Sequence, residues 1–376
     1  MYIKFLFGRR FKAFVGALAL SLFLVIPTTA FAQSSTAQPA HAVQGSYQQT
    51  NLVADQTGVA PATDPHLINP WGLAASATGP WWTSDNNSGF STLYNGQGQI
   101  VSLVVTVPPP GGSPAGTISA PTGIVFNSTT GFMVSENGVS GAAAFIFSTE
   151  DGTISGWNPT VDRTHAILTV DRSKVGPGAV YKGLAIGTTS AGTFIYATNF
   201  RFGTVEMFDS NFHLVRSFTD PFIFRGFAPF GIQNIGGDLY VTFARQSADR
   251  HDSVAGRGLG FIDVFNTSGR LLRRFRSGGD LNAPWGLALA PANFGAFSND
   301  LLVGNFGDGH INVFDPKTGR DLGQPRTSSG APIVIDGLWA LQFGNGATAG
   351  ATNDLFFTAG PQKESHGLFG KIDSVG

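Results

Sequence analysis

Side chains that could carry out chemistry gather in two polar segments, residues 245–258 and residues 360–366. The candidates within them are Asp249, His251, Asp252, Glu364 and His366. Imidazole nitrogens and carboxylate oxygens can hold a divalent metal ion or serve as a general acid and base. Either use requires the two segments to converge in the fold, because the sequence has no HExxH or comparable ligand spacing. The alternative is two solvated loops stabilised by surface ion pairs.

Several other chemistries are excluded by residue content. The chain has no Cys, so a thiolate zinc site, a disulfide scaffold and a cysteine nucleophile are impossible. No GxSxG nucleophile elbow, P-loop or dinucleotide fingerprint is present. Glu150 and Asp151 are adjacent carboxylates, but adjacent residues on a turn diverge, and the Asp151-Gly152 step alone accounts for a tight hairpin.

The elements that position these residues follow from an internal repeat. A pattern of a glycine, five residues with alternating apolar positions and then an Asp or Asn recurs six times. The six copies are 89–95, 152–158, 203–209, 260–266, 309–315 and 367–373. The terminal Asp or Asn of each copy is expected to initiate a turn, since these side chains cap turns well.

A second anchor precedes each copy and has a bulky or polar residue, then Gly or Ala, then Leu or Ile. Its first residues are Trp71, Thr122, Lys182, Phe230, Trp285 and Trp339. Each repeat contains four short strands separated by turn formers, and a single four-stranded unit cannot bury both of its faces. We therefore predict an all-β fold, a six-bladed β-propeller.

Closure of this ring can also be predicted. The sixth unit ends at Gly376 without an outermost strand, whereas the other five have one. Residues 47–54 have the pattern of the missing strand, so the N-terminal strand is expected to complete the last blade. The predicted organisation is a signal peptide over 1–32, a flexible leader over 33–46 and the propeller over 47–376.

The repeats resemble NHL-type propellers, which share P-x-G-[LI] and G-x-I-x-V-F-D elements. Over the whole mature chain, the motifs at 69–73, 149–159, 283–295 and 366–370 are similar to an uncharacterised family of secreted bacterial proteins. A more distant similarity is to gluconolactonase/regucalcin-like propellers. That likeness implies Asp, Asn and Glu around a calcium ion, including the position before the inner-strand glycine. Here that position carries no carboxylate, which disfavours such a lactonase.

A ligand site is expected on the face of the disc that carries the second-to-third-strand loops. The predicted ligand-binding residues are Trp71, Trp285, Trp339, Lys182, Asn199 and Asn305. The three Trp could stack on a sugar, or they could fill the central channel as core aromatics do. Lys182 could contact an anionic substrate, or it could form a salt bridge with a loop carboxylate.

The N-terminal segment predicts export. Lys4, Arg9, Arg10 and Lys12 precede an apolar run, and Ala30-Phe31-Ala32 matches a cleavage site. That run is shorter than the ~20 residues of a membrane span, so no span is expected after signal removal. Removal of residues 1–32 takes away these four basic residues and makes the formal net charge more negative than −1, which disfavours nucleic acid as a partner.

These observations predict a secreted or periplasmic scaffold that binds an unknown small molecule, carbohydrate or protein, with no cofactor. The alternative is a metal-assisted hydrolase or lyase that uses the His251 and His366 loops. Its catalytic candidates are His251, His366, Asp252 and Glu364, and its weak metal ligands are Asp249, His251 and His366.

Overall fold

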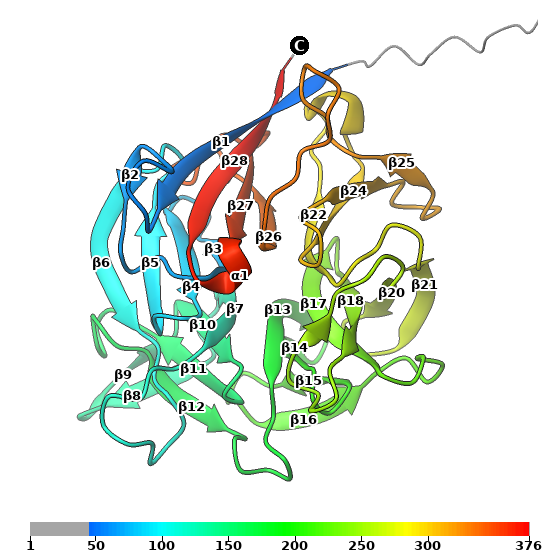
Figure 1. The fold of residues 1–376 in the computed structure, drawn as a ribbon. Coiled ribbons are helices and arrows are strands. Elements are labelled where there is room, and N and C mark those ends of the chain that lie inside the picture. The colour runs from blue at the N-terminus through cyan, green and yellow to red at the C-terminus, as the bar shows by residue number, and fades with distance from the viewer. Residues whose placement is uncertain (1–44, 376) are drawn as a thin grey trace, which may run out of the picture. The chain divides into compact units, whose positions relative to one another are not determined.

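The computed structural model describes residues 45–375, which form six antiparallel sheets arranged as blades around an axis (Figure 1). The predicted signal peptide and nearly all of the predicted leader lie outside the described residues. The predicted six-bladed propeller is therefore confirmed. Within residues 45–375, no helix is long and apolar enough to span a membrane.

Within each blade the strands lie side by side from the axis outward. In that order, blade 1 contains β3 (Pro70–Ala75), β4 (Trp81–Asp85), β5 (Phe90–Tyr94) and β6 (Ile100–Thr106). Blade 2 contains β7 (Pro121–Phe126), β10 (Phe145–Thr149), β11 (Thr153–Trp157) and β12 (Ile167–Asp171). Blade 3 contains β13 (Tyr181–Thr189), β14 (Gly192–Asn199), β15 (Thr204–Phe208) and β16 (Leu214–Phe218).

The other three blades follow the same order. Blade 4 contains β17 (Phe227–Ile235), β18 (Asp238–Gln246), β20 (Gly260–Asn266) and β21 (Leu271–Ser277), with β19 (Ser253–Val254) paired to β18. Blade 5 contains β22 (Pro284–Leu289), β23 (Leu301–Asn305), β24 (Ile311–Phe314) and β25 (Asp321–Gly323). Blade 6 contains β26 (Leu338–Phe343), β27 (Leu355–Ala359), β28 (Leu368–Val375) and β1 (Ser46–Ala54), with β2 (Ala62–Thr63) beside β1.

The predicted closure of the ring is confirmed. β1 pairs antiparallel with β28 from Ser46 opposite Val375 to Ala54 opposite Leu368, with one bulge after Asn51. The first described strand thus supplies the outer strand that the last repeat lacks. Figure 1 shows β1 and β28 crossing the same blade side by side.

The inner-strand glycines explain how closely the blades approach each other. A Cβ on Gly72 would lie 2.4 Å from the Thr122 carbonyl oxygen of the next blade. One on Gly231 would lie 2.1 Å from the Trp285 carbonyl oxygen. These distances are too short for any side chain, so glycine lets each inner strand pack directly on its neighbour. These glycines recur in the repeats, so neighbouring inner strands can approach one another closely around the axis of the ring.

The repeated Asp and Asn residues are turn-forming at five of six positions. Asn95, Asn158, Asp209, Asn266 and Asp315 each accept a hydrogen bond from the backbone N–H two residues later. Asp373 is an exception to that prediction. It lies inside β28 and forms an ion pair with Lys371 at 3.0 Å, because the next strand comes from the other end of the chain and no turn is needed.

Five additions to the repeats were not predicted. They are the hairpin of β8 (Met133–Glu136) and β9 (Val139–Ala142), the short strands β2 and β19, the single turn α1 (Pro361–Glu364), and the 3-10 turn η1 (Gly295–Phe297). Asn137 and Gly138 connect β8 to β9 with φ angles of 50° and 81°. Asn-Gly is the strongest short hairpin signal, so this element could have been found in the sequence.

Candidate functional site

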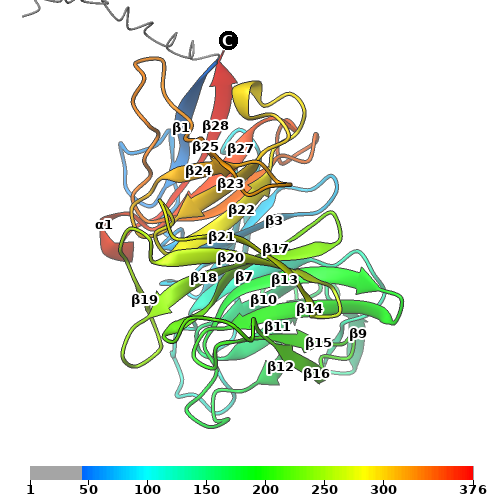
Figure 2. The same ribbon diagram turned by 90° about the vertical axis from the view of Figure 1, so that its right-hand side faces the viewer.

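The two enlarged loops lie on one face of the disc. Figure 2, which shows the disc edge-on, places α1 and β19 on the same side. This is the face toward the viewer in Figure 1, and we call it the loop-bearing face. The arrangement agrees with the predicted placement of the loops between second and third strands.

Beneath this face an aromatic layer surrounds the axis. The Trp71 and Trp339 rings stack with centroids 3.5 Å apart, and Trp285 meets both edge-on at 6.2 and 5.8 Å. Phe230 packs against Trp71 at 6.4 Å. All four side chains are buried, so the predicted Trp residues contact one another as core aromatics do. Below them, near Trp285, the axial cavity measures about 30 Å³, which accommodates water but no ligand.

Lys182 is the cation of the axial site. Its side chain is only 1% exposed and lies over the Trp71 ring, with Nζ 5.0 Å from the ring centroid. The ammonium forms a salt bridge with Glu150 and lies 3.6 Å from an Asp252 carboxylate oxygen. A salt bridge between Lys182 and a loop carboxylate was one of the two predicted alternatives, and this alternative is confirmed.

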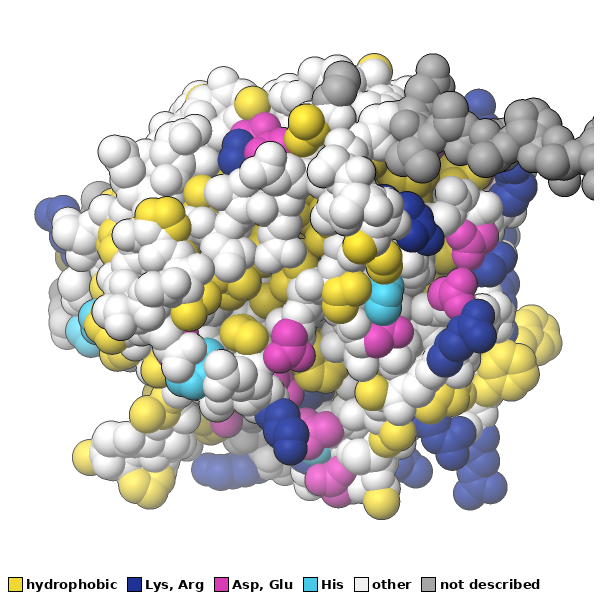
Figure 3. Space-filling view, turned by 45° about the horizontal axis from the view of Figure 1, so that its top comes forward, with side chains coloured by type: hydrophobic (Ala, Val, Ile, Leu, Met, Phe, Trp, Pro, Cys, Tyr) yellow, Lys and Arg dark blue, Asp and Glu magenta, His cyan; other side chains and the backbone are white. Residues whose placement is uncertain are grey.

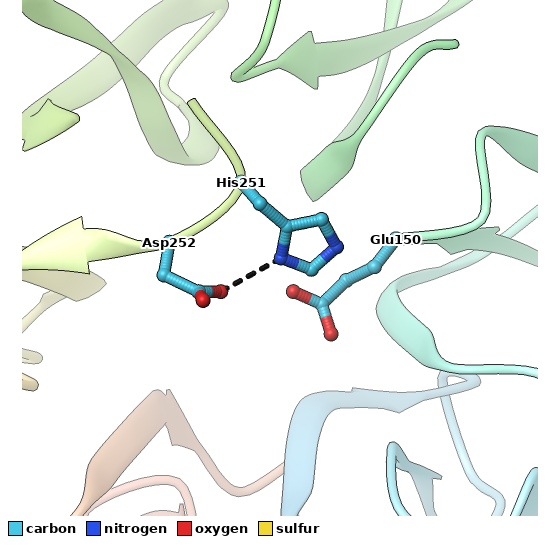
Figure 4. A group of neighbouring side chains, drawn as sticks. All are labelled: Glu150, His251 and Asp252. Carbon is cyan, nitrogen blue, oxygen red and sulfur yellow. Dashed lines mark hydrogen bonds and ion pairs between the residues drawn. The ribbon is translucent and has the colours of Figure 1, made fainter. Parts of the chain in front are cut away.

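His251 and Asp252 project from the enlarged blade 4 loop toward Glu150 of blade 2 (Figure 4). His251 Nδ1 lies 2.8 Å from Asp252 Oδ1, and the other ring nitrogen, on the side of the ring toward Glu150, has no hydrogen-bond partner among the described residues. The hydrogen bond to Asp252 raises the pKa of His251 above its ordinary value, with a further contribution from Glu150, against the opposing effect of burial. The same hydrogen bond lowers the pKa of Asp252.

Glu364 reaches the same site from α1. Its Oε2 accepts a 2.9 Å hydrogen bond from Asn69, whose own Oδ1 accepts one from the Trp339 indole at 2.9 Å. Burial raises the pKa of Glu364, and the negative charges of Glu150 and Asp252 raise it further. We call this group of five side chains the axial cluster: Lys182, Glu150, His251, Asp252 and Glu364.

His366 belongs to a different part of the molecule, so the convergence of His251 and His366 that the enzyme alternative requires does not occur. Its Nδ1 lies 2.7 Å from Asp55 Oδ2, and its Nε2 lies 3.0 Å from the Gln56 amide. Asp55 follows β1, and its other oxygen accepts a hydrogen bond from the Gly367 N–H at 2.9 Å. His366 thus links the segment after β1 to the start of β28, and its two ring nitrogens contact Asp55 and Gln56 rather than the axial cluster.

The remaining predicted residues have separate partners. The buried Asn199 donates to Glu206 at 3.1 Å, and the buried Asn305 donates to the Asp280 carbonyl at 2.8 Å. Asp249 lies fully exposed on the blade 4 loop, where its hydrogen bond with Ser247 lowers its pKa. These three side chains have their hydrogen-bond partners outside the axial cluster.

One group of side chains in the described residues has the geometry to hold a metal ion. Glu150, His251 and Asp252 each offer a ligand atom, and these atoms lie within 4.8 Å of one another. One nitrogen and two carboxylate oxygens suit several divalent metals. However, the Lys182 ammonium already contacts both carboxylates, so a metal ion held between them would lie next to it, whereas the 70% exposed Asp252 side chain remains open to a cation from the solvent side.

Sequence reasoning missed two contributors to this region, Asn69 and Asp55, which are not among the candidate residues. Glu150 is expected on this face, because it lies in a second-to-third-strand loop, but it is not among the predicted ligand-binding residues. Asp55 could not have been found, since its contact with His366 spans 311 positions and depends on the register of β1 against β28.

The comparisons with known proteins place the chain among relatives without an assigned activity. No model of a known protein family matches it. One uncharacterised protein of Acanthamoeba polyphaga mimivirus is 35% identical over 329 residues, covering 85% of this chain and 78% of the viral protein. A second is 32% identical over 329 residues, covering 85% and 84%. The chain belongs to the family of these viral proteins. Both relatives are viral, whereas the sequence motifs suggested a bacterial family.

Solved structures support the propeller at the level of fold. A streptogramin B lyase has a TM-score of 0.51 at 13% identity, over 88% of this chain and 98% of the other. A gluconolactonase of Xanthomonas campestris has a TM-score of 0.51 at 15% identity, over 82% and 86%. An aldose sugar dehydrogenase of Escherichia coli has a TM-score of 0.51 at 11% identity, over 87% and 99%. Identities this low show a shared fold and leave activity open.

Proposed function

We propose that this member of the family is an exported binding scaffold whose axial cluster receives a positively charged group of a small molecule, a sugar or a protein. The cluster that supports this proposal contains three carboxylates, Glu150, Asp252 and Glu364, against the single ammonium of Lys182 and the imidazole of His251, whose pKa is raised by its hydrogen bond to Asp252. The proposal of export depends on the signal-peptide pattern of residues 1–32, and its expected destination is the periplasm or the exterior of the cell.

The excess of negative charge is the observation that carries the proposal. Lys182 is buried beneath the site and pairs with Glu150, while Asp252 contacts His251 and Lys182, so two basic groups stand against the three carboxylates of Glu150, Asp252 and Glu364. The Asp252 side chain is 70% exposed, and the raised pKa of Glu364 reflects repulsion from Glu150 and Asp252 as well as burial. A ligand ammonium or guanidinium would relieve that repulsion, because opposite charges within a few ångströms stabilise each other.

The shape of the site also favours binding over chemistry. The aromatic layer closes the axis immediately below Lys182, so a ligand would rest on the loop-bearing face rather than pass into the channel. Figure 3 shows acidic side chains gathered with histidine and apolar side chains on the face turned forward in that view. Polar groups displayed on a rigid support are typical of ligand-binding loops.

A binding assay with charged and neutral probes tests the proposal. Calorimetry would compare 1,5-diaminopentane and glucosamine with neutral N-acetylglucosamine. We expect the cationic probes to bind more tightly, and Asp252→Asn to weaken them about fivefold, the effect of one screened charge contact. Asp162→Asn is the matched control. Asp162 also pairs with a histidine, with its Oδ2 3.2 Å from His165 Nδ1, but it is not part of the axial cluster. Equal binding of neutral and cationic probes would overturn the proposal.

A second candidate function is a metal-assisted hydrolase or lyase. It is favoured by the 4.8 Å grouping of Glu150, His251 and Asp252, and it no longer includes His366. A metal bound there would activate water or polarise a substrate oxygen, with His251 and the carboxylates as its ligands. Stoichiometric Mn²⁺ or Zn²⁺ in the purified protein, lost in His251→Ala, would favour this function. Metal retained in His251→Ala, or metal that fails to bind, would count against it.

A further inference from the structure

A second feature of the loop-bearing face is a short segment with unusually exposed aromatic side chains. Residues 219–226 connect β16 of blade 3 to β17 of blade 4. Within it Phe222 is 79% exposed and Phe224 is 57% exposed. Phenylalanine at such exposure on an isolated loop is unfavourable in water, so the segment is a candidate contact surface.

The segment is held firmly while its two rings remain in solvent. Asp220 is buried, forms an ion pair with Arg274, and accepts a 2.8 Å hydrogen bond from the Phe222 N–H. Ile223, between the two phenylalanines, packs against the core shared by blades 3 and 4. The Arg274 guanidinium lies 5.5 Å from the Phe224 ring centroid. The exposed rings are therefore displayed by an anchored loop.

Arginines surround this loop. Arg225 belongs to it, and Arg245 lies beside it, because Gln246 donates a backbone hydrogen bond to the Gly226 carbonyl at 2.8 Å. Gln246 also donates to the Phe200 carbonyl at 2.6 Å, which connects the loop to a hollow of about 680 Å³ lined by Arg201, Phe202 and Arg250. Among residues 45–375, no ion pair joins Arg201, Arg225, Arg245 or Arg250 to a carboxylate. Asp249 is the one acidic residue lining that hollow.

We propose that Phe222, Phe224 and these four arginines form a docking surface for an anionic lipid bilayer. Paired aromatic side chains that project from a convex loop suit insertion into the interfacial region of a membrane. Adjacent guanidinium groups suit the phosphates of the headgroups, which attract basic residues near the surface. Figure 3 shows hydrophobic side chains projecting from the right-hand edge of the molecule, with Lys and Arg side chains next to them.

A bilayer matches this surface better than a soluble acidic protein does. Protein interfaces usually bury their aromatic anchors in a fitted pocket at the centre of the contact. Here the two phenylalanines stand at the periphery of a blade, and the arginines extend from them across the loop-bearing face. The local positive charge also contrasts with the formal net charge of −1 for the whole chain. This surface borders the axial cluster at Arg250 but shares no residue with it, so docking does not depend on the ligand proposed there.

The test uses the absence of cysteine in the chain. Phe222→Cys and, as the matched control, Ile118→Cys, at a position 62% exposed on another part of the molecule, each accept one environment-sensitive fluorophore. Vesicles of phosphatidylcholine alone are compared with vesicles that contain roughly 30% phosphatidylglycerol. We expect a blue shift of the label at 222 with the anionic vesicles only, weakened by added salt, and no shift of the label at 118.

Two unlabelled double variants separate the contributions. Phe222→Ser/Phe224→Ser is expected to lower partitioning onto anionic vesicles about tenfold or more, and Arg225→Gln/Arg245→Gln about tenfold. Arg320→Gln, an exposed arginine of blade 5, is expected to leave partitioning unchanged. These side chains are exposed, so unchanged circular dichroism would confirm folding. Failure to bind anionic vesicles, binding without a shift at 222, or binding only to a soluble acidic polymer such as polyaspartate would each overturn the proposal.

Discussion

The two histidine–aspartate pairs on the enlarged loops are alike in chemistry and different in setting. His251 contacts Asp252 at 2.8 Å and His366 contacts Asp55 at 2.7 Å. The first pair stands on the loop-bearing face beside Glu150 and Lys182, and one nitrogen of its ring has no hydrogen-bond partner among the described residues. The second pair joins the segment after β1 to the start of β28, and both of its ring nitrogens have partners.

This difference shows that a histidine–aspartate pair has no fixed role. A ring with both nitrogens engaged inside a strand junction stabilises that junction. A ring that keeps one nitrogen open next to excess negative charge can bind or transfer a proton. The first pair therefore belongs to the candidate site, and the second belongs to the closure of the propeller.

The largest effect is expected from breaking the buried ion pair under the axial cluster. Lys182→Met leaves the carboxylate of Glu150, itself only 11% exposed, without its partner. We expect a loss of about 3–5 kcal/mol in the free energy of unfolding, measured by urea denaturation. The double variant Lys182→Met/Glu150→Gln removes the stranded charge and should recover much of that loss. If the free energy of unfolding of Lys182→Met lay within about 1 kcal/mol of the parent value, the Lys182–Glu150 pair would not be a major contributor to stability.

An intermediate effect is expected at the closure of the ring. His366→Ala removes two side-chain contacts and leaves the partly buried Asp55 short of a donor, which should cost about 1–3 kcal/mol of stability. His251→Ala should change stability by less than about 0.5 kcal/mol, because its side chain is 36% exposed and its partner Asp252 is 70% exposed, whereas Asp55 beside His366 is only 12% exposed. Thermal unfolding of both variants, with the exposed His213→Ala as a control, measures the contrast. Equal losses at 251 and 366 would contradict the distinction drawn between the two pairs.

The smallest effect is electrostatic and depends on pH. Because the pKa of His251 is raised in the folded state, its stabilising contribution is present below the unfolded pKa of about 6.5 and is lost as pH rises through the folded pKa. Because the pKa of Asp252 is lowered, its contribution is present above about 3.9 and is lost as pH falls through the folded pKa. The pair should therefore contribute between about pH 4 and pH 6.5.

Asp252→Asn tests that window. It should bring the pKa of His251 down toward its ordinary value, as measured by NMR of the imidazole protons, and change stability by no more than about 1 kcal/mol. If the pKa of His251 stayed equally high in Asp252→Asn, the hydrogen bond to Asp252 would not be its main cause.

Much of the fold was predictable because it repeats. The close approach at Gly72 and Gly231 requires a residue without a side chain, and this requirement recurs at a readable spacing. Comparison of the repeats also showed that the last one lacks its outer strand, and residues 47–54 have the pattern of that strand. Lys182 could be paired with a loop carboxylate because each blade brings the residue before its glycine to the axis.

The composition of the site was less predictable because its contacts join distant loops. His251 lies 101 positions from Glu150, and His366 lies 311 positions from Asp55, so neither spacing appears in a local motif. Their distances depend on loop paths and on the β1–β28 register, which no short pattern specifies. Sequence alone therefore identified the histidines and could not assign their partners.

The central claim is that the axial cluster, and not the closure of the ring, receives a cation. The most direct test is to titrate the protein with 1,5-diaminopentane while the imidazole resonances of His251 and His366 are followed by NMR. A cation bound beside Glu150 and Asp252 should shift the His251 resonances saturably and lower its pKa, and should leave His366 unchanged. Resonances of His251 that stay fixed, or that move no more than those of His366, would contradict the account.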